Sequence, residues 1–296
     1  MPNVSIIIPT NNSEKYLQPL TYSILGQTYT DFEVIIVDNF SNDNTINALK
    51  NLSKLDKRFK YYQIHNNGII AKSRNFGIEK SNGKYIAFLD SDDYWHKEKL
   101  KDCLKYFPQY DFVYNLMKIR SKNNFYYNNK ILYSYQLSDK PFIDMMTKGN
   151  PISTSSVILK KSLINEKKFF SEEKDFFAIE DFDCWIKLSR KNIKFKMVNS
   201  VLGFYNMSNY SSSSYVNNKK NNYNLNKIYL KNLKFIKNHK IEKISKNHFR
   251  YLMANNCRNV RYKLLVYKSL LFKVTPKISK FKLILKILFF QFLKND

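Results

Sequence analysis

Short apolar runs alternate with stretches of helical spacing over residues 1–90. The runs are rich in Val, Ile, Phe and Tyr, which is typical of buried strands. They predict strands at residues 4–9, 33–38, 59–64 and 85–89, with helices after Ser13 and at residues 45–55 and 69–80. Because strands that alternate with helices need crossover connections, the pattern predicts an α/β fold. We expect a mostly parallel, doubly wound sheet with helices on both faces.

The second half of the chain has a more mixed pattern. It predicts helices at residues 97–106 and from Phe182 on, and strands at residues 112–114, 152–159, 195–198 and 201–205, the last two as a closing pair. Residues 121–136 are rich in Asn and Tyr and fit a hairpin or a loose excursion. From Lys219 the pattern is helical and has no strand signals. We therefore predict a sheet-containing domain at residues 1–215 and a helical region at residues 216–296.

Polar side chains follow several of the predicted strands at the point where each strand ends. Thr10, Asp38 and the segment Asp90-Ser91-Asp92 all hold such positions. Ligands of open parallel sheets bind beyond the carboxyl ends of the strands, so these residues predict a nucleotide pocket. Neither G-x-G-x-x-G nor G-x-x-x-x-G-K-[ST] occurs in the chain, which disfavours a dinucleotide oxidoreductase and a P-loop enzyme.

Two carboxylate clusters are candidates for chemistry. Asp90, Asp92 and Asp93 lie within four residues, and their mutual repulsion calls for a counter-cation. Oxygen ligands favour Mg²⁺ or Mn²⁺ shared with phosphates; the alternative is a polar loop that caps the next helix. Glu180 and Asp181 stand at the amino end of a predicted helix, where a helix cap is the alternative to a catalytic role.

The net charge of +26 is concentrated in the last third of the chain. Residues 1–183 hold 25 Lys and Arg against 22 Asp and Glu, whereas residues 184–296 hold 25 against 2. The alternatives are a solvated helical surface and an anionic partner, either a membrane surface or a phosphate-bearing substrate.

A helical face of apolar and aromatic residues lies near the carboxyl end, between Phe281 and Phe292, with lysines off that face. The run falls short of the ~18 apolar residues that span a bilayer. It fits a helix lying in the membrane interface, and a packed core helix is the alternative. The first predicted strand begins directly after Met1-Pro2-Asn3, which predicts no signal peptide. The three cysteines are widely spaced, which fits a reducing cytoplasm.

Taken together, the motifs resemble the family 2 glycosyltransferases of the GT-A fold, particularly bacterial enzymes that build surface polysaccharides. The resemblance covers about residues 4–205 and rests on motifs that occur in the family's order. They are Val4-Ser5-Ile6-Ile7-Ile8-Pro9-Thr10, Gln27-Thr28-Tyr29, Val37-Asp38-Asn39, Ser73-Arg74-Asn75-Phe76-Gly77, Asp90-Ser91-Asp92-Asp93, and Glu180-Asp181 with Trp185.

The resemblance implies roles for the donor-site residues. Pro9, Thr10 and Asp38 would hold the uracil and ribose of a UDP-sugar, and Arg74 would approach the base or the pyrophosphate. Asp90 and Ser91 would contact the ribose or sugar. Asp92 would bind a divalent Mn²⁺ or Mg²⁺ ion that bridges both phosphates. Many relatives carry a His or a basic residue after the late strand, where this chain has Tyr205-Asn206-Met207-Ser208. The metal site would then rest on Asp92 and phosphate, or the metal requirement would be weak.

On the acceptor side, the resemblance implies that Asp181 is the general base, with Glu180 in support. Trp95 and Trp185 would form part of the acceptor site, with core packing as the alternative for at least one of them. The implied protein is an inverting glycosyltransferase at the inner face of the cytoplasmic membrane. It would move one sugar from a UDP-sugar to a lipid-linked glycan during the synthesis of lipopolysaccharide, O-antigen or capsule. The alternatives are a nucleotide sugar other than a UDP-sugar, an RNA-binding protein, and a nucleotide-binding scaffold without catalysis; we expect no nucleic-acid partner.

Overall fold

Two compact units make up the chain. The computed structural model describes residues 2–121, 128–207 and 219–256. The first unit contains Met1–Pro141 and Asn150–Ser212, and the second contains Phe142–Gly149 and Ser213–Asp296. Helix α5 (Pro141–Lys148) therefore groups almost entirely with the carboxyl-terminal unit. The predicted division at residue 215 differs from the observed units in this segment.

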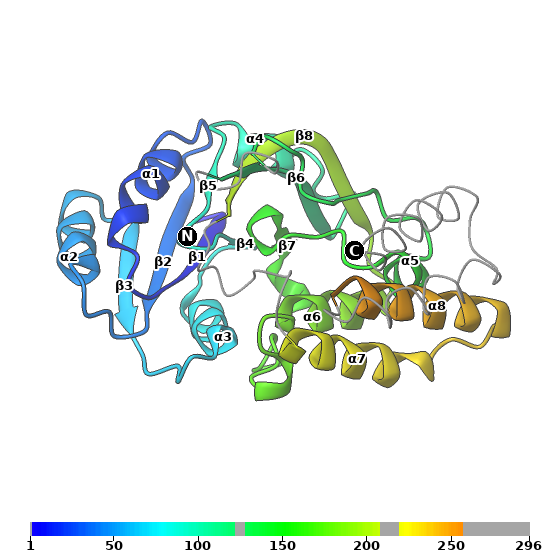
Figure 1. Ribbon diagram of the computed structural model, residues 1–296. Coiled ribbons are helices and arrows are strands. Elements are labelled where there is room, and N and C mark those ends of the chain that lie inside the picture. Colours follow the sequence, from blue (N-terminus) through cyan, green and yellow to red (C-terminus); the bar gives the residue numbers. More distant parts are fainter. Residues whose placement is uncertain (1, 122–127, 208–218, 257–296) are drawn as a thin grey trace. The chain divides into compact units, whose positions relative to one another are not determined.

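The first unit begins with the predicted alternation of strands and helices (Figure 1). The elements are β1 (Val4–Thr10), α1 (Glu14–Leu25), β2 (Phe32–Asp38), α2 (Thr45–Leu55), β3 (Phe59–Gln63), α3 (Ile70–Lys80) and β4 (Tyr85–Phe88). Every residue of β1, β2 and β4 is buried, as expected for central strands of a parallel sheet that is covered on both faces.

The strands of this unit form one eight-stranded mixed sheet, in the order β3-β2-β1-β4-β7-β6-β8-β5 (Figure 1). The later elements are β5 (Tyr94–Trp95), α4 (Lys99–Leu104), β6 (Phe112–Arg120), β7 (Ile158–Lys160), α6 (Glu180–Ser189) and β8 (Phe195–Asn206). Strands β3, β2, β1 and β4 are parallel, as are β6 and β8, whereas β7 and β5 run antiparallel to their neighbours. The predicted α/β class with a mostly parallel sheet is confirmed.

Two of the later strand predictions are wrong in detail. Residues 152–159 are not one strand, because Thr154–Ser156 form a 3₁₀ turn, η1, before β7. The Ser156 hydroxyl donates to the Ser153 carbonyl (2.7 Å) and closes this turn. Residues 195–206 are a single strand, β8, and not a closing pair. It runs parallel to β6 along its whole length, with register shifts on either side of Leu116.

Helix α3 packs unusually close to the centre of the sheet. A Cβ atom placed on Gly77 would lie 2.5 Å from Ile7 Cγ2 on β1, so only glycine permits this approach. Arg74 lies one turn before Gly77 on the same helix and is buried. The close packing therefore fixes the position of a charged side chain beside the carboxyl ends of β1 and β4.

The second unit is helical in its described residues. Besides α5 it contains α7 (Lys219–Leu233) and α8 (His239–Asn256). The Ser245 hydroxyl donates to the Met146 carbonyl (2.9 Å), which connects α8 to α5, and the ring of Tyr229 on α7 lies 5.3 Å from that of Phe249. Among the described helices, none is both long and apolar enough to cross a membrane. The predicted interfacial helix at residues 281–292 lies outside the described residues.

Candidate active site

Thr10 and Asp38 end the neighbouring parallel strands β1 and β2 and are paired in register. The fully buried Asp38 carboxylate accepts hydrogen bonds from the Ser41 N–H (2.9 Å), from the Ser41 hydroxyl and from Gln63 Nε2 (3.1 Å). Thr10 Oγ1 is buried and has no hydrogen-bond partner among the described residues, and Pro9 before it is buried too. A buried polar atom without a partner needs an explanation, and a ligand is one. This end of the sheet therefore offers a fixed carboxylate beside a free hydroxyl.

Arg74 connects the two predicted carboxylate clusters. Its Nη2 donates to Asp90 Oδ1 (2.7 Å) and its Nη1 donates to Glu180 Oε1 (2.6 Å). The Arg74 side chain is 3% exposed, so solvent screens these ion pairs little. Burial alone would lower the pKa of Arg74, but the two carboxylates raise it above its ordinary value. Residues that lie sixteen and 106 positions from Arg74 in the sequence thus meet at one guanidinium.

The first cluster follows β4 and is anchored on both sides. The Asp90 N–H donates to Ser155 Oγ (3.1 Å), and the Ser91 hydroxyl lies 2.9 Å from the Ser13 hydroxyl before α1. Asp92 is half-buried and has no comparable ion pair with a described residue. Burial and the neighbouring Asp90 raise the pKa of Asp92 to about 6. A cation at Asp92 would relieve this repulsion.

Asp93 belongs to the framework of the cluster. Its carboxylate is buried and accepts the backbone N–H of Asn206 (2.9 Å), which ties the cluster to the end of β8. Burial and the nearby Asp92 and Asp90 raise the pKa of Asp93 well above its ordinary value. The alternative interpretation, a loop that caps the next helix, is disfavoured. Helix α4 begins only at Lys99, its cap residue is Glu98, and no side chain makes a capping hydrogen bond there.

The second cluster lies at the start of α6. Asp181 is half-buried; its Oδ2 accepts from the Thr154 hydroxyl (3.1 Å) and its Oδ1 from the Phe182 N–H (2.6 Å). Burial and the adjacent Glu180 raise the pKa of Asp181 to about 7, although Arg74 works in the opposite direction. The cap residue of α6 is Ile179, without a side-chain capping bond. A partly exposed carboxylate that titrates near neutral pH suits proton transfer better than helix capping.

The carboxylates of Glu180 and Asp183, both buried on α6, have different partners. Glu180 Oε2 is buried and has no hydrogen-bond partner among the described residues, so only one of its oxygens is used by Arg74. Asp183, two residues after Asp181, instead forms an ion pair with Lys187 (2.5 Å) one turn along α6. Asp183 is therefore part of the helix's own packing, and it is a natural control for Asp181.

Both tryptophans that were expected at the acceptor site are buried. Trp185 is fully buried, with its ring 5.0 Å from Phe112 and 5.7 Å from Phe170, both edge-on. Trp95 is 3% exposed, and its Nε1 donates to the Ser155 carbonyl (2.7 Å). Neither indole presents a surface to an acceptor, so the predicted acceptor role is corrected: we assign both side chains to core packing.

Sequence analysis missed the polar side chains that support the two clusters. Gln63 ends β3 and donates to Asp38, while Thr154 and Ser155 in the η1 turn contact Asp181 and the Asp90 N–H. The available signal was the run Ser153-Thr154-Ser155-Ser156, four hydroxyl residues between apolar positions. Read as part of a strand, they would alternate between faces. As a 3₁₀ turn they bring neighbouring hydroxyls to both clusters.

The residues of the first cluster fit a divalent cation that is held by a single carboxylate of the protein. Asp90 is already paired with Arg74 and Asp93 is buried against Asn206, so Asp92 is the carboxylate of this cluster left for a metal ion. The described residues contain no group of three or more His, Cys, Asp and Glu side chains suited to hold a metal. The cluster fits Mg²⁺ or Mn²⁺ bound by the Asp92 carboxylate and by phosphate oxygens of a nucleotide. Mg²⁺ is often held in this way, by one or two carboxylates and substrate phosphates.

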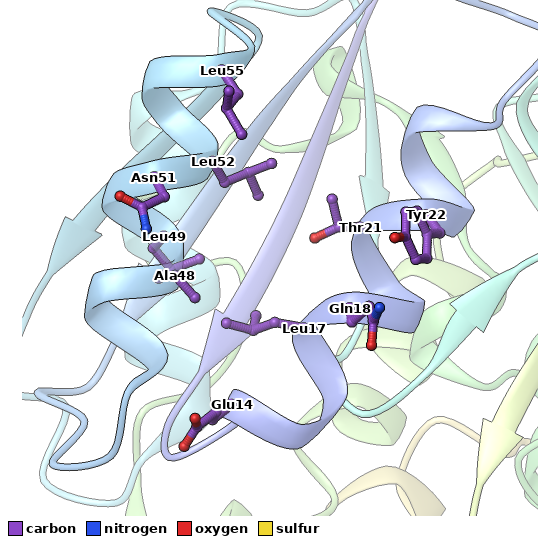
Figure 2. A pocket seen from close by; sticks show the side chains of 10 residues that line it. All are labelled: Glu14, Leu17, Gln18, Thr21, Tyr22, Ala48, Leu49, Asn51, Leu52 and Leu55. Carbon is purple, nitrogen blue, oxygen red and sulfur yellow. The ribbon is translucent and has the colours of Figure 1, made fainter.

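A groove lies between α1 and α2, and none of the residues that line it belongs to either carboxylate cluster. Figure 2 shows side chains of the two helices facing it, among them Leu17 on α1 and Leu52 on α2. Its volume is about 310 Å³, and its lining is largely apolar, with Glu14 at one end. The groove has neither a carboxylate pair nor a cationic side chain in its lining, so it does not offer a site for a nucleotide sugar.

Residues 5–166, more than half of the chain, match the family model described as Glycosyl transferase family 2. The chain belongs to this family. The match includes Thr10, Asp38, Arg74 and Asp92 and ends before Glu180. Membership favours the enzyme interpretation over the RNA-binding and scaffold alternatives.

Among curated proteins, the chain is similar to TuaG of Bacillus subtilis, a glycosyltransferase assigned to teichuronic acid biosynthesis. The two are 28% identical over 221 residues, which cover 72% of this chain and 82% of TuaG. It is also similar to TarS of Staphylococcus aureus, a poly(ribitol-phosphate) beta-N-acetylglucosaminyltransferase. Here the identity is 36% over 126 residues, which cover 42% of this chain and 22% of TarS. The chain thus spans most of one relative and less than a quarter of the other.

Solved structures of glycosyltransferases share the fold of this chain. The structure of residues 1–349 of S. aureus TarS in complex with UDP-GlcNAc has a TM-score of 0.63 at 20% identity, and covers 92% of this chain and 81% of that one. A mannosyltransferase of Pyrobaculum calidifontis, PcManGT, in complex with GDP-Man and Mn²⁺, has a TM-score of 0.62 at 14% identity, covering 93% and 76%. The predicted GT-A fold is confirmed.

Proposed function

We propose that this chain is an inverting glycosyltransferase that moves one sugar from a UDP-sugar to a glycan acceptor during synthesis of a bacterial cell-surface polymer. The observation that carries the proposal is the double ion pair of Arg74. It joins the carboxylates after β4, which suit a nucleotide sugar, to the helix start that presents Asp181. Donor and acceptor chemistry would therefore meet at one rigid centre, as a group-transfer reaction requires.

The donor site would lie at the carboxyl ends of β1 and β2. The free Thr10 hydroxyl and the Asp38 carboxylate can hydrogen-bond to a uracil ring, with Asp38 accepting from its N3–H. Ser41 and Gln63 hold that carboxylate in place. The relative TarS, whose structure contains UDP-GlcNAc, supports a UDP-sugar. A GDP-sugar is the second candidate, because the mannosyltransferase of similar fold was solved with GDP-Man and Mn²⁺.

Asp92 would hold a divalent ion together with the donor phosphates, and the ion would offset the charge that grows on the departing nucleotide. Asp90 and Ser91 would contact the ribose or the sugar. Arg74 acts differently from a phosphate-binding arginine, because both of its outer nitrogens already pair with carboxylates. In this proposal its role is to position Asp90 and Glu180.

Asp181 would act as the general base. The acceptor oxygen forms a bond to the anomeric carbon while its proton passes to an Asp181 carboxylate oxygen. The bond between that carbon and the nucleotide oxygen breaks, and its electron pair leaves with the nucleotide. A single displacement of this kind inverts the anomeric configuration. A pKa of about 7 leaves a substantial ionised fraction of Asp181 near neutral pH, and it makes the carboxylate a stronger base than an ordinary aspartate.

The acceptor in this proposal is a lipid-linked glycan at the inner face of the cytoplasmic membrane. Support comes from TuaG and TarS, whose names refer to teichuronic acid and to poly(ribitol-phosphate), and from the basic carboxyl-terminal third of the chain. Lipopolysaccharide, O-antigen and capsule remain the polymer classes that the sequence resemblance implies. Catalysis would belong to residues 1–215 and membrane attachment to residues 216–296.

Nucleotide binding tests the donor site. Calorimetry with UDP, GDP, CMP and a short RNA, with and without Mn²⁺, should show the tightest binding for UDP. Asp38→Asn keeps the size of the side chain but replaces the carboxylate oxygen that would accept from uracil. Losing a hydrogen bond to a charged group should weaken UDP binding by ~1.5–3 kcal/mol, about tenfold or more.

Glu33→Gln is a matched control, because Glu33 is a second buried carboxylate on β2, at the end of the strand remote from Asp38. It is held by Ser5, Lys60 and the Asn82 N–H. Its replacement should leave UDP affinity unchanged. Unaltered UDP binding by Asp38→Asn, or tighter binding of RNA than of any nucleotide, would contradict the proposal.

A further inference from the structure

The η1 turn, Thr154–Ser156, touches both carboxylate clusters with consecutive residues. The Thr154 hydroxyl donates to Asp181 Oδ2 (3.1 Å), and the Ser155 hydroxyl accepts from the Asp90 N–H (3.1 Å). The Ser155 carbonyl accepts from the indole of Trp95 (2.7 Å). The turn is thus held against the donor cluster while it supplies the one side-chain hydrogen bond recorded for Asp181 among the described residues.

A buried lysine, Lys99, also holds the η1 turn through its backbone. Lys99 Nζ donates to the Ser156 carbonyl (2.5 Å) and to Asn115 Oδ1, and lies 3.5 Å from Cys103 Sγ. Lys99 has no exposed surface, and burial lowers its pKa. A cation or amine placed in the core is costly unless it is fully hydrogen-bonded. These contacts therefore fix the backbone of the turn, and with it the position of the Thr154 hydroxyl.

The groups that face Asp181 are few and can be named. Glu180 is its neighbour on α6 and disfavours its ionised form, whereas Arg74 from α3 favours it. The Phe182 N–H donates to Oδ1, and the Thr154 hydroxyl, from the turn, donates to Oδ2. Each oxygen therefore carries one donor and keeps a lone pair for a proton. Hydrogen bonds at both oxygens also oppose rotation of the carboxylate about its Cβ–Cγ bond.

We propose that Thr154 is a positioning residue for the base: its hydroxyl orients the Asp181 carboxylate and stabilises its ionised form. This inference rests on the proposed function, in which Asp181 takes the acceptor proton. Because Thr154 and Ser155 are adjacent, the turn would also set the distance from the base to the donor cluster. The hydroxyl can follow the carboxylate as it gains and loses the proton, since it is both donor and acceptor.

The test is the pKa of Asp181 itself, which needs neither donor nor acceptor. Asp labelled with ¹³C at the carboxyl carbon is titrated by NMR in the full chain, and Asp181→Asn identifies the signal. Thr154→Val keeps the shape of the side chain and removes the donor, so we expect the pKa of Asp181 to rise by about one unit. The acidic limb of the pH profile of sugar transfer should move to higher pH by the same amount. Thr154→Ser should restore both values.

Ser156→Ala is the matched control, because its hydroxyl bonds within the turn, to the Ser153 carbonyl, and does not contact Asp181. It should leave the pKa of Asp181 unchanged. If Thr154→Val does not fold, Thr154→Ala serves in the same titration. An unchanged pKa in a folded Thr154 variant, or an equal shift in Ser156→Ala, would overturn the inference. A shift in Thr154→Val together with normal transfer by Asp181→Asn would instead overturn the assignment of the base.

Discussion

The guanidinium of Arg74 makes two hydrogen bonds that a lysine could not reproduce together. Its two outer nitrogens diverge in one plane, and each meets a different carboxylate, Asp90 at 2.7 Å and Glu180 at 2.6 Å. The guanidinium also lies 5.5 Å from the Phe170 ring, over its face. The pair with Glu180 depends most on its partner, because the Glu180 side chain is 7% exposed and little water could replace the lost cation, whereas the Asp90 side chain is 29% exposed.

Arg74→Met should therefore lower the free energy of unfolding by ~3–5 kcal/mol, as expected when one partner of a buried ion pair is removed. Urea denaturation followed by circular dichroism measures this loss. The control is Arg58→Met, which breaks an ion pair with Asp56 whose side chains are 31% and 23% exposed. That change should cost about 1 kcal/mol or less. Equal losses in the two variants would show that Arg74 is not the structural centre of the site.

Single residues were predictable where their position in the pattern carried information. Thr10, Asp38 and the cluster after β4 follow apolar runs, and parallel strands bring their carboxyl ends to one edge of a sheet. Arg74, Asp90 and Glu180 were each predicted as site residues, but the pairing of Arg74 with the two carboxylates was not, because it depends on contacts across 16 and 106 residues. The predicted acceptor role of Trp95 and Trp185 was wrong for a similar reason. The sequence near a motif does not show whether an aromatic side chain is buried or exposed.

Elements were predictable in proportion to their regularity. Strands β1 and β2 agree with the pattern because they are buried and mostly apolar, and α1 agrees because Leu17, Leu20 and Ile24 form one buried face. Strand β3 and helix α3 are less regular: β3 has exposed positions, and the buried positions of α3 include polar side chains. The η1 turn was missed, since Ser and Thr are compatible with a strand and their turn-forming hydrogen bonds are local choices. Strand β8 was divided in two at Asn199-Ser200, two exposed polar residues that the structure accommodates by register shifts against β6.

The net charge is distributed unevenly along the sequence. Nearly all of the net positive charge lies in residues 184–296, beyond most of the sheet. The described helices α7 and α8 pack with α5 as a unit of their own. An anionic membrane surface is the partner that we propose for this basic region, and each lysine near such a surface contributes ~1 kcal/mol, weakened by salt.

Removal of residues 277–296 tests the membrane proposal. The truncation deletes five lysines and the segment that the sequence predicts to be an apolar helical face, so binding to vesicles that contain phosphatidylserine should fall sharply, while UDP binding stays intact. Co-sedimentation at low and high salt measures the first effect and calorimetry the second. Vesicles of phosphatidylcholine alone are the control. Loss of UDP binding after truncation would mean that the segment is a core helix; unchanged vesicle binding would contradict its interfacial role.

If the start of α6 supplies the base, sugar transfer should respond very differently to the replacement of two nearby aspartates. Asp181→Asn keeps the shape of the side chain and removes its basicity, whereas Asp183→Asn changes a carboxylate two residues away that is paired with Lys187. UDP-sugars are first screened for transfer by the wild type, and the sugar that it transfers is then used for both variants. The variants are compared after calorimetry and thermal melting show that their UDP affinity and melting temperature match those of the wild type. General-base assistance is worth ~10²–10⁴-fold, so Asp181→Asn should transfer sugar at least ~10²-fold more slowly than the wild type, with Asp183→Asn close to it. Normal transfer by Asp181→Asn would show that Asp181 is not the base, and a loss confined to Asp183→Asn would show that Asp183 has this role instead.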